Sequence, residues 1–243
     1  SPLQPWAAAL TVRMRRHLAL KLVGTTAVIG LFFIAYLHLL HQPAYPVTVM
    51  PLTALDPLIP LQPQALFAYL SLWLYVGVGP GLQLNFRELV VYAAWIGVLC
   101  LTGLVIFYFW PTQVPPLALD VSHFPGFAML QGVDAAGNAC PSMHVTIATF
   151  TVIRIEDVLR RVGAPAFLRI FNVVWFLAIA LSTLAIKQHV VLDAAAGALL
   201  GIVFALPSLR WRPSARQAAA EVVGHPPSED RSRAGAQSVV AQP

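Results

Sequence analysis

The segment CPSMHVT, residues 140–146, sets a proline, a serine and a histidine together in a chain that is otherwise strongly apolar. Pro141 followed by Ser142 is typical of a helix start, with Ser142 as the N-cap residue. A second polar segment, KQHVVLDAAAG at 187–197, places Asp193 four residues after His189. The rest of the sequence indicates which kind of protein presents these two segments.

Composition separates this chain from ordinary soluble domains. Of its 243 residues, 58% are hydrophobic and only 10% are charged, whereas soluble domains carry about 25% charged residues. This deficit excludes a soluble fold and predicts an all-α membrane protein with several spans in one domain. The two cysteines, Cys100 and Cys140, make neither a disulfide framework nor a pair of metal ligands.

A helix needs about 20 apolar residues to cross the hydrocarbon core. Six stretches approach that length, and we predict a six-transmembrane-helix bundle with spans near 18–40, 64–79, 89–110, 142–155, 166–186 and 190–206. The expected domain boundaries are a basic N-terminal segment at 1–17, the membrane domain at 18–207 and a tail at 208–243. Because the tail has no apolar periodicity, we expect it to be disordered.

All Lys and Arg residues except Lys187 fall on one side of this six-span arrangement. The positive-inside rule makes that side cytoplasmic, so both termini are predicted to be cytoplasmic. The formal charge of +5 is then an orientation signal, and nucleic-acid binding is not expected. His144 and His189 both fall at the opposite boundary, which faces the periplasm, the cell exterior or an organelle lumen.

The residue types in the two polar segments suit phosphoryl transfer. The first N–H groups of a helix lack partners within it and attract an oxyanion, and His144 in that turn can donate a proton to a leaving oxygen. The spacing of His189 and Asp193 predicts that they share one face of a helix. A carboxylate next to one ring nitrogen leaves the other free as a nucleophile. The alternative for this pair is a structural hydrogen bond between helices.

Over about residues 18–207 the sequence resembles the type 2 phosphatidic acid phosphatase (PAP2) superfamily of integral-membrane enzymes. PSMH at 141–144 is similar to that family's Pro-Ser-x-His motif, and HVVLD at 189–193 is similar to its His-x-x-x-Asp motif. The resemblance implies that His189 is the phosphorylated nucleophile, Asp193 its orienting partner and His144 the proton donor. It also implies a phosphate contact from Ser142, and no need for a metal or another cofactor.

The sequence departs from the common family pattern at two basic positions. The family's third motif begins Ser-Arg where this chain has Ser182 and Thr183, and the first motif, Lys-x6-Arg-Pro, is missing. In its place stands FYFWPTQVPPL, which resembles the inositol phosphorylceramide synthase-like subgroup and offers Thr112 as a neutral phosphate contact. Lys187 is the one basic side chain on this side and is a further candidate for binding phosphate.

Other polar or small residues receive structural interpretations. Gly197 and Gly201 form a small-xxx-small pair suited to close helix contact. Asp56 and Asn138 are interpreted as turn residues, with a lipid entry route and a substrate contact as the respective alternatives. The segment RIEDVLRRVG at 154–163 is interpreted as a solvated turn with helical charge pairing.

Together these features predict an enzyme that hydrolyses or transfers the phosphate of a lipid at the outer leaflet, through a phosphohistidine on His189. Its expected partners are a lipid phosphate and the bilayer, and a homo-oligomer is left open. The missing Arg residues motivate an alternative, a catalytically degenerate membrane scaffold or lipid-binding protein. A transporter is less favoured because the polar groups gather near the outer boundary rather than the midplane, and no metal site is expected.

Overall fold

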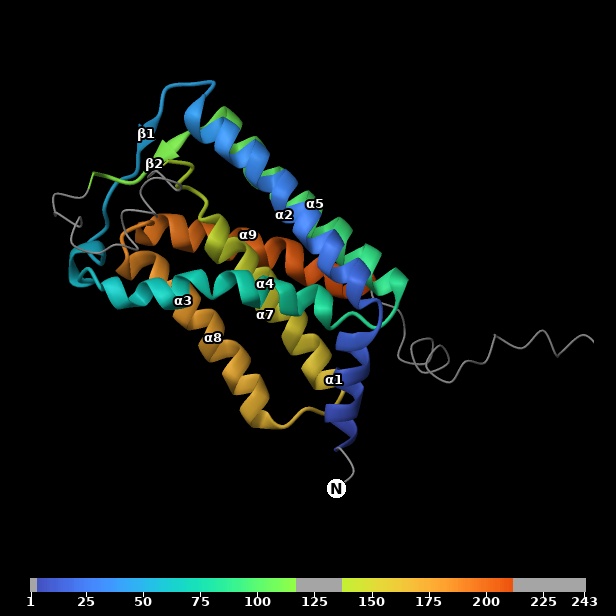
Figure 1. Ribbon diagram of the computed structural model, residues 1–243. Helices are drawn as coiled ribbons and strands as arrows, with labels where there is room; N and C mark the ends of the chain where they lie inside the picture. The colour runs from blue at the N-terminus through green and yellow to red at the C-terminus, as the bar shows by residue number, and fades with distance from the viewer. Residues whose placement is uncertain (1–3, 117–136, 212–243) are drawn as a thin grey trace, which may run out of the picture. The chain divides into compact units, whose positions relative to one another are not determined.

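The computed structural model describes residues 4–116 and 137–211, and these residues form a bundle of helices (Figure 1). The α-helices are α1 (Pro5–Arg15), α2 (Leu18–His41), α3 (Leu66–Leu70), α4 (Leu72–Gly81), α5 (Phe86–Phe109), α7 (Met143–Arg161), α8 (Ala166–Ala185) and α9 (Val191–Ser208). Short 3-10 helices occur at Asp56–Leu58, Pro63–Ala65 and Leu209–Trp211. Most of the predicted tail, from residue 212 onward, lies outside the described residues.

Within the described residues, four helices are long and apolar enough to cross a membrane: α2, α5, α8, and α9 with the turn that follows it. They correspond to the first, third, fifth and sixth predicted spans, and they fit an integral membrane protein. The second predicted span is broken at Ser71, whose hydroxyl donates to the Ala68 carbonyl oxygen at 2.6 Å and so competes with the helical hydrogen bonds. The fourth does not end near residue 155 but continues as α7 through charged residues to Arg161.

The long segments run between two ends of the bundle. At one end, α7 and α9 begin, and Tyr69 of α3 contacts His144 of α7; we call this the histidine end. At the other end, Lys21 near the start of α2 donates to the carbonyl oxygen of Gly81, the last residue of α4. We call this the basic end.

Helices α7 and α9 approach most closely where α9 carries two glycines. A Cβ atom on Gly197 would lie 2.5 Å from the carbonyl oxygen of Ser142, and one on Gly201 would lie 2.6 Å from that of Thr146. Because real side chains do not approach a backbone so closely, this contact requires glycine at both positions. The predicted small-xxx-small contact is confirmed.

Helix α7 is also held by α8, α4 and α5. Asn172 of α8 donates to the Val152 carbonyl oxygen at 3.1 Å and accepts from the Tyr75 hydroxyl of α4 at 2.7 Å. Phe150 of α7 is fully buried, and its ring lies 5.5 Å from the ring of Tyr92 of α5. The helix that carries His144 is therefore held by α4, α5 and α8 as well as by α9.

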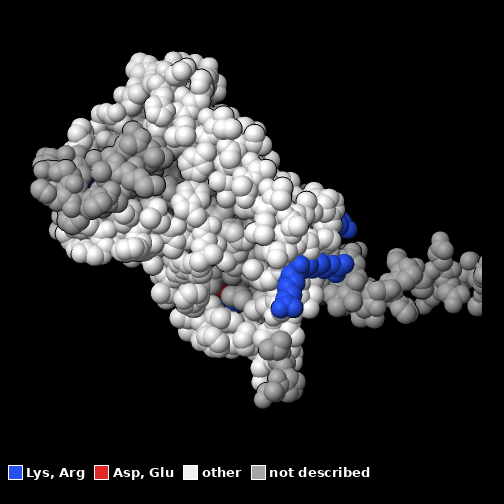
Figure 2. Space-filling view, viewed as in Figure 1, with Lys and Arg blue, Asp and Glu red and all other residues white. Residues whose placement is uncertain are grey.

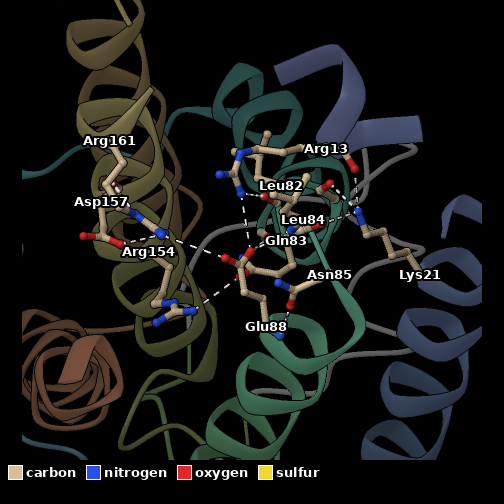
Figure 3. A network of polar contacts seen from close by, with 12 residues as sticks. Arg13, Lys21, Leu82, Gln83, Leu84, Asn85, Glu88, Arg154, Asp157 and Arg161 are labelled. Atoms are coloured by element: carbon tan, nitrogen blue, oxygen red, sulfur yellow. Dashed lines mark hydrogen bonds and ion pairs between the residues drawn. The ribbon is translucent and has the colours of Figure 1, made fainter. Parts of the chain in front are cut away.

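The basic end holds a buried polar network (Figure 3). The Lys21 ammonium donates to the carbonyl oxygens of Arg13, Gly81 and Gln83 at 2.6–2.8 Å. Arg13 pairs with Glu88 at 3.4 Å, and burial lowers the pKa of the Arg13 guanidinium despite the opposing charge of Glu88. Removing one partner of a buried pair costs about 3–5 kcal/mol, so this network ties α1, α2, α4 and α5 together.

The interpretation of residues 154–163 as a solvated turn is wrong, because most of them continue α7. Arg154 is only 3% exposed and donates to the Ser208 carbonyl oxygen at the end of α9 at 3.1 Å. The expected helical charge pairing is present, with Arg160 and Glu156 2.7 Å apart. The charged residues of this segment thus anchor α7 within the basic end.

A small strand pairing departs from the all-α prediction. Strand β1 (Thr48–Val49) lies parallel to β2 (Thr112–Gln113), with Thr48 opposite Thr112. The pairing joins the loop after α2 to the segment after α5 at the histidine end, so two loops far apart in sequence support the same surface.

The glycine contact predicts opposite effects at two positions. Gly197→Ala should destabilise the protein, because inserting carbon into a packed contact costs about 1–3 kcal/mol. Gly97→Ala is the control: a Cβ there meets nothing within 4 Å, and alanine is favoured over glycine in a helix by about 1 kcal/mol. Thermal unfolding in detergent measures the difference, and equal melting temperatures would contradict the close contact.

Candidate active site

The first turn of α7 begins as the sequence predicts. Ser142 is the N-cap residue, and its hydroxyl accepts a hydrogen bond from the Val145 N–H at 3.3 Å. The Ser142 N–H donates to the carbonyl oxygen of Asp193 at 3.0 Å. A backbone hydrogen bond therefore joins the starts of α7 and α9 and holds the two histidine segments together.

His189 and Asp193 are neighbours, but not because they share a helix face. Helix α9 begins at Val191, so His189 precedes it and the spacing argument is wrong. The Asp193 carboxylate folds back over the first turn, where its Oδ2 accepts from the Val190 N–H at 2.9 Å. The same oxygen lies 3.6 Å from Nδ1 of His189. Both side chains are buried, so the carboxylate can stabilise a positive charge on the ring.

His144 lies against an aromatic ring that the sequence motifs do not include. Tyr69 of α3 stacks on it with ring centroids 4.3 Å apart and an interplanar angle of 26°. The Tyr69 hydroxyl lies 3.4 Å from Nδ1 of His144. Tyr69 is only 2% exposed. Sequence reasoning missed it because an aromatic residue in an apolar span carries no local signal of a site.

The two imidazoles face the same space. The ring centroids of His144 and His189 are 6.1 Å apart, and both side chains line the same cavity. The sequence prediction requires these two residues, which come from separate helical segments, to lie close together. The structure brings them together at the histidine end.

A cavity of about 270 Å³ extends from the histidines into the apolar interior. Its walls come from α2, α4, α5 and the first turns of α7, and they are almost entirely apolar. Along α2 the lining runs from Tyr36 at the histidine end to Leu20 at the basic end, which is about 24 Å at 1.5 Å per helical residue. The cavity thus joins a polar site to a long apolar space.

Lys187 lies at the same end, but its ammonium points into the loop that precedes α3. It donates to the carbonyl oxygens of Asp56 and Ile59. The Asp56 carboxylate accepts a hydrogen bond from the Val191 N–H at 2.8 Å. Interpreting Asp56 as a turn residue missed this contact, and the only signal in the sequence was an acid within an apolar, Pro-rich loop.

Thr112 and Asn138 support the segment that leads into α7. The Thr112 hydroxyl oxygen accepts from the Cys140 N–H at 2.8 Å. Asn138 has a φ of 49°, which suits the turn expected there, and its side-chain amide donates to the Tyr36 carbonyl oxygen at 3.0 Å. Phosphate contacts by Thr112, Ser142 and Lys187 stay predictions.

Among residues 4–116 and 137–211, no group of three or more His, Cys, Asp and Glu side chains is arranged to hold a metal ion. The site offers two imidazoles, a buried carboxylate and the N-terminus of α7. Such a set can bind an oxyanion, attack a phosphorus atom and protonate a leaving oxygen.

Comparison with known proteins agrees with this chemistry. The chain matches the model of the PAP2 superfamily over residues 61–206, a range that includes both histidine segments. No curated protein and no solved structure matches the chain.

Proposed function

The chain belongs to the PAP2 superfamily, and from this premise we propose that it is an integral-membrane enzyme that hydrolyses or transfers the phosphate of a lipid. Phosphoric ester hydrolysis is the general activity of that superfamily. The observation that carries the proposal is the pairing of His144 and His189, with centroids 6.1 Å apart, at one end of an apolar cavity.

The proposed reaction has two steps. Nε2 of His189 attacks phosphorus, so that an N–P bond forms while the bond from phosphorus to the lipid oxygen breaks and His144 donates a proton to that oxygen. Water or an alcohol then attacks the phosphorus atom of the phosphohistidine while His144 takes up its proton. The N–P bond breaks, which frees His189 and releases phosphate or the new phosphate ester. Asp193, 3.6 Å from Nδ1 of His189, stabilises the positive ring and directs Nε2 toward phosphorus.

Charge on the phosphate oxygens is stabilised at the start of α7. The positive dipole end of this helix lies beside His144, the second residue of α7, and a helix start of this kind favours a bound oxyanion. Ser142 caps the helix there. This arrangement supplies part of the stabilisation that the family's missing Arg residues would provide.

The apolar cavity favours a lipid as the substrate. A phosphate held between His144 and His189 would leave its hydrocarbon chain next to Trp73 and Phe33, both of which line the cavity. Burying apolar surface contributes about 25 cal/mol per Å². The hydrocarbon chain of the lipid therefore contributes most of the binding free energy, and the phosphate determines where the lipid is held.

We further propose the six-span topology. In it, α3 and α4 together form the second span, and α7 forms the fourth. The alternation of the segments between the histidine end and the basic end supports it. On the face shown in Figure 2, the Lys and Arg side chains lie near α1 and the rest of the surface is almost uncharged. In this proposal, which follows the positive-inside rule, both termini are cytoplasmic and the site is at the periplasmic, extracellular or lumenal surface. The domain boundaries 1–17, 18–207 and 208–243 belong to the same proposal.

Headgroup transfer remains the finer proposal within this activity. It rests on the segment PTQVPP at 111–116 and on Thr183, which stands where the common pattern has Arg. Transfer and hydrolysis differ only in whether an alcohol or water attacks the phosphohistidine.

One observation favours a second candidate, a non-catalytic lipid-binding scaffold. The ammonium of Lys187 is bound by the carbonyl oxygens of Asp56 and Ile59, and Thr183 donates its hydroxyl to the Ala180 carbonyl oxygen at 2.7 Å. Neither residue replaces a phosphate-binding Arg. A bound lipid that survives both His144→Ala and His189→Ala would support the scaffold.

Substitution of the nucleophile tests the enzymatic proposal. His189→Ala should lower phosphate release from phosphatidic acid or an isoprenyl diphosphate by about 10³-fold or more, in buffer with chelator. Wild type with ³²P-labelled substrate should give an acid-labile phosphohistidine that His189→Ala lacks. His41→Ala, at the same end but outside the site, is the matched control. If wild type neither releases phosphate nor forms a transfer product, the enzymatic proposal fails.

Filling the cavity tests the lipid proposal. Gly24 lines the cavity and Gly30, on the same helix, does not, while a Cβ at either position meets nothing within 4 Å. Gly24→Phe should lower kcat/KM for a long-chain lipid phosphate about tenfold, equivalent to about 1.4 kcal/mol, and leave a short-chain soluble phosphate unaffected. Gly30→Phe should change neither. Equal losses with both substrates would show that the cavity does not hold the chain.

A further inference from the structure

We propose that Asp56 and Lys187 form a reciprocal latch that positions the nucleophile His189, and that Lys187 acts through this latch rather than by binding phosphate. The inference rests on the proposed function, because it assigns positioning roles for the same reaction. Asp56 belongs to the loop before α3, and Lys187 precedes His189 by two residues.

The first half of the latch is the Asp56 carboxylate. Its Oδ1 accepts from the Val191 N–H at 2.8 Å, and its Oδ2 accepts from the N–H and hydroxyl of Thr53 at 2.6 and 2.7 Å. Val191 is the first residue of α9, so a negative charge here is favoured by the helix dipole and bound by a charge-assisted hydrogen bond. The carboxylate is held on both sides, and Asp56 as a whole is 7% exposed.

The second half is the Lys187 ammonium, which reaches from the His189 segment to the loop that contains Asp56. It donates to the carbonyl oxygens of Asp56 and Ile59 in the same loop. The loop thus binds the chain two residues before His189 and again two residues after it. His189 lies between two anchoring points on one loop.

The backbone between these points shows why the loop matters. Each backbone N–H from Lys187 to Val191 has an acceptor. The Lys187 N–H donates to Leu184 O, and those of Gln188 and His189 both donate to Thr183 O. The Val190 N–H donates to Asp193 Oδ2, and the Val191 N–H donates to Asp56 Oδ1. All but the last come from the same stretch of chain. Asp56 is 135 positions from Val191, so this acceptor joins the His189 segment to a distant loop, in addition to the bond between the Ser142 N–H and the Asp193 carbonyl oxygen.

Ionisation keeps the latch closed at neutral pH. Burial raises the pKa of Asp56, but hydrogen bonds from Thr53 and Val191 and the charge of Lys187 outweigh it, so that the pKa lies below its ordinary value. A displacement of about 1 Å at a catalytic group can cost about 10²-fold in rate. Loss of either half of the latch therefore lowers turnover without removing a group that touches substrate.

A double-mutant cycle tests the latch. Asp56→Ala and Lys187→Met should each lower kcat at least about tenfold while KM stays within about threefold. The double variant should be no slower than the slower single variant, since coupled residues are not additive. Arg87→Met, an exposed cation at the basic end, is the control for loss of charge. If Lys187→Met raises KM at unchanged kcat, and its effect adds to that of Asp56→Ala, Lys187 binds phosphate and the latch is refuted.

Hydrogen exchange gives a readout that does not need turnover. Asp56→Ala should speed amide exchange at residues 187–193 and leave the amides of α5 unchanged. Unchanged exchange at 187–193 would overturn the latch even in an active enzyme. If wild type shows no turnover but Asp56→Ala still exchanges faster at residues 187–193, the latch is supported and the proposed function fails. The two outcomes are therefore distinguishable.

Discussion

The close contact of α9 with the first turns of α7 is the constraint on which the histidine end depends. Gly197 and Gly201 let the two backbones approach to a distance that no side chain would permit. That approach allows the Ser142 N–H to reach the carbonyl oxygen of Asp193. One contact therefore sets the position of the helix start that carries His144 and of the turn that carries His189. Small residues have this role in membranes because packing, rather than hydrophobic burial, drives helix association there.

The site is built by supporting contacts as much as by its reactive groups. Tyr69 stacks against His144 from a short helix, and a loop residue, Asp56, binds the first N–H of α9. Both supports are buried, which strengthens their polar contacts by excluding water. The two imidazoles are thereby fixed next to an apolar cavity.

The opposite end uses charge for a different purpose. Lys21, Arg13 and Arg154 direct their charges inward to carbonyl oxygens and to Glu88 instead of outward to water (Figure 3). Buried cations are costly unless they are paired or hydrogen-bonded. These buried cations therefore hold the helix ends together at the basic end.

The sequence by itself determined the membrane class, four of the long helices, the Ser142 cap and the glycine contact of α9. Each depends on a local property: apolar length, capping chemistry or the spacing of small residues. The tertiary structure alone decided that the second segment breaks at Ser71, that the Asp193 carboxylate folds back over the first turn of α9 to meet His189, and that Tyr69 and Asp56 support the site. The last two contacts join residues 75 and 135 positions apart. No local pattern encodes such pairs, because their proximity exists only after the helices have packed.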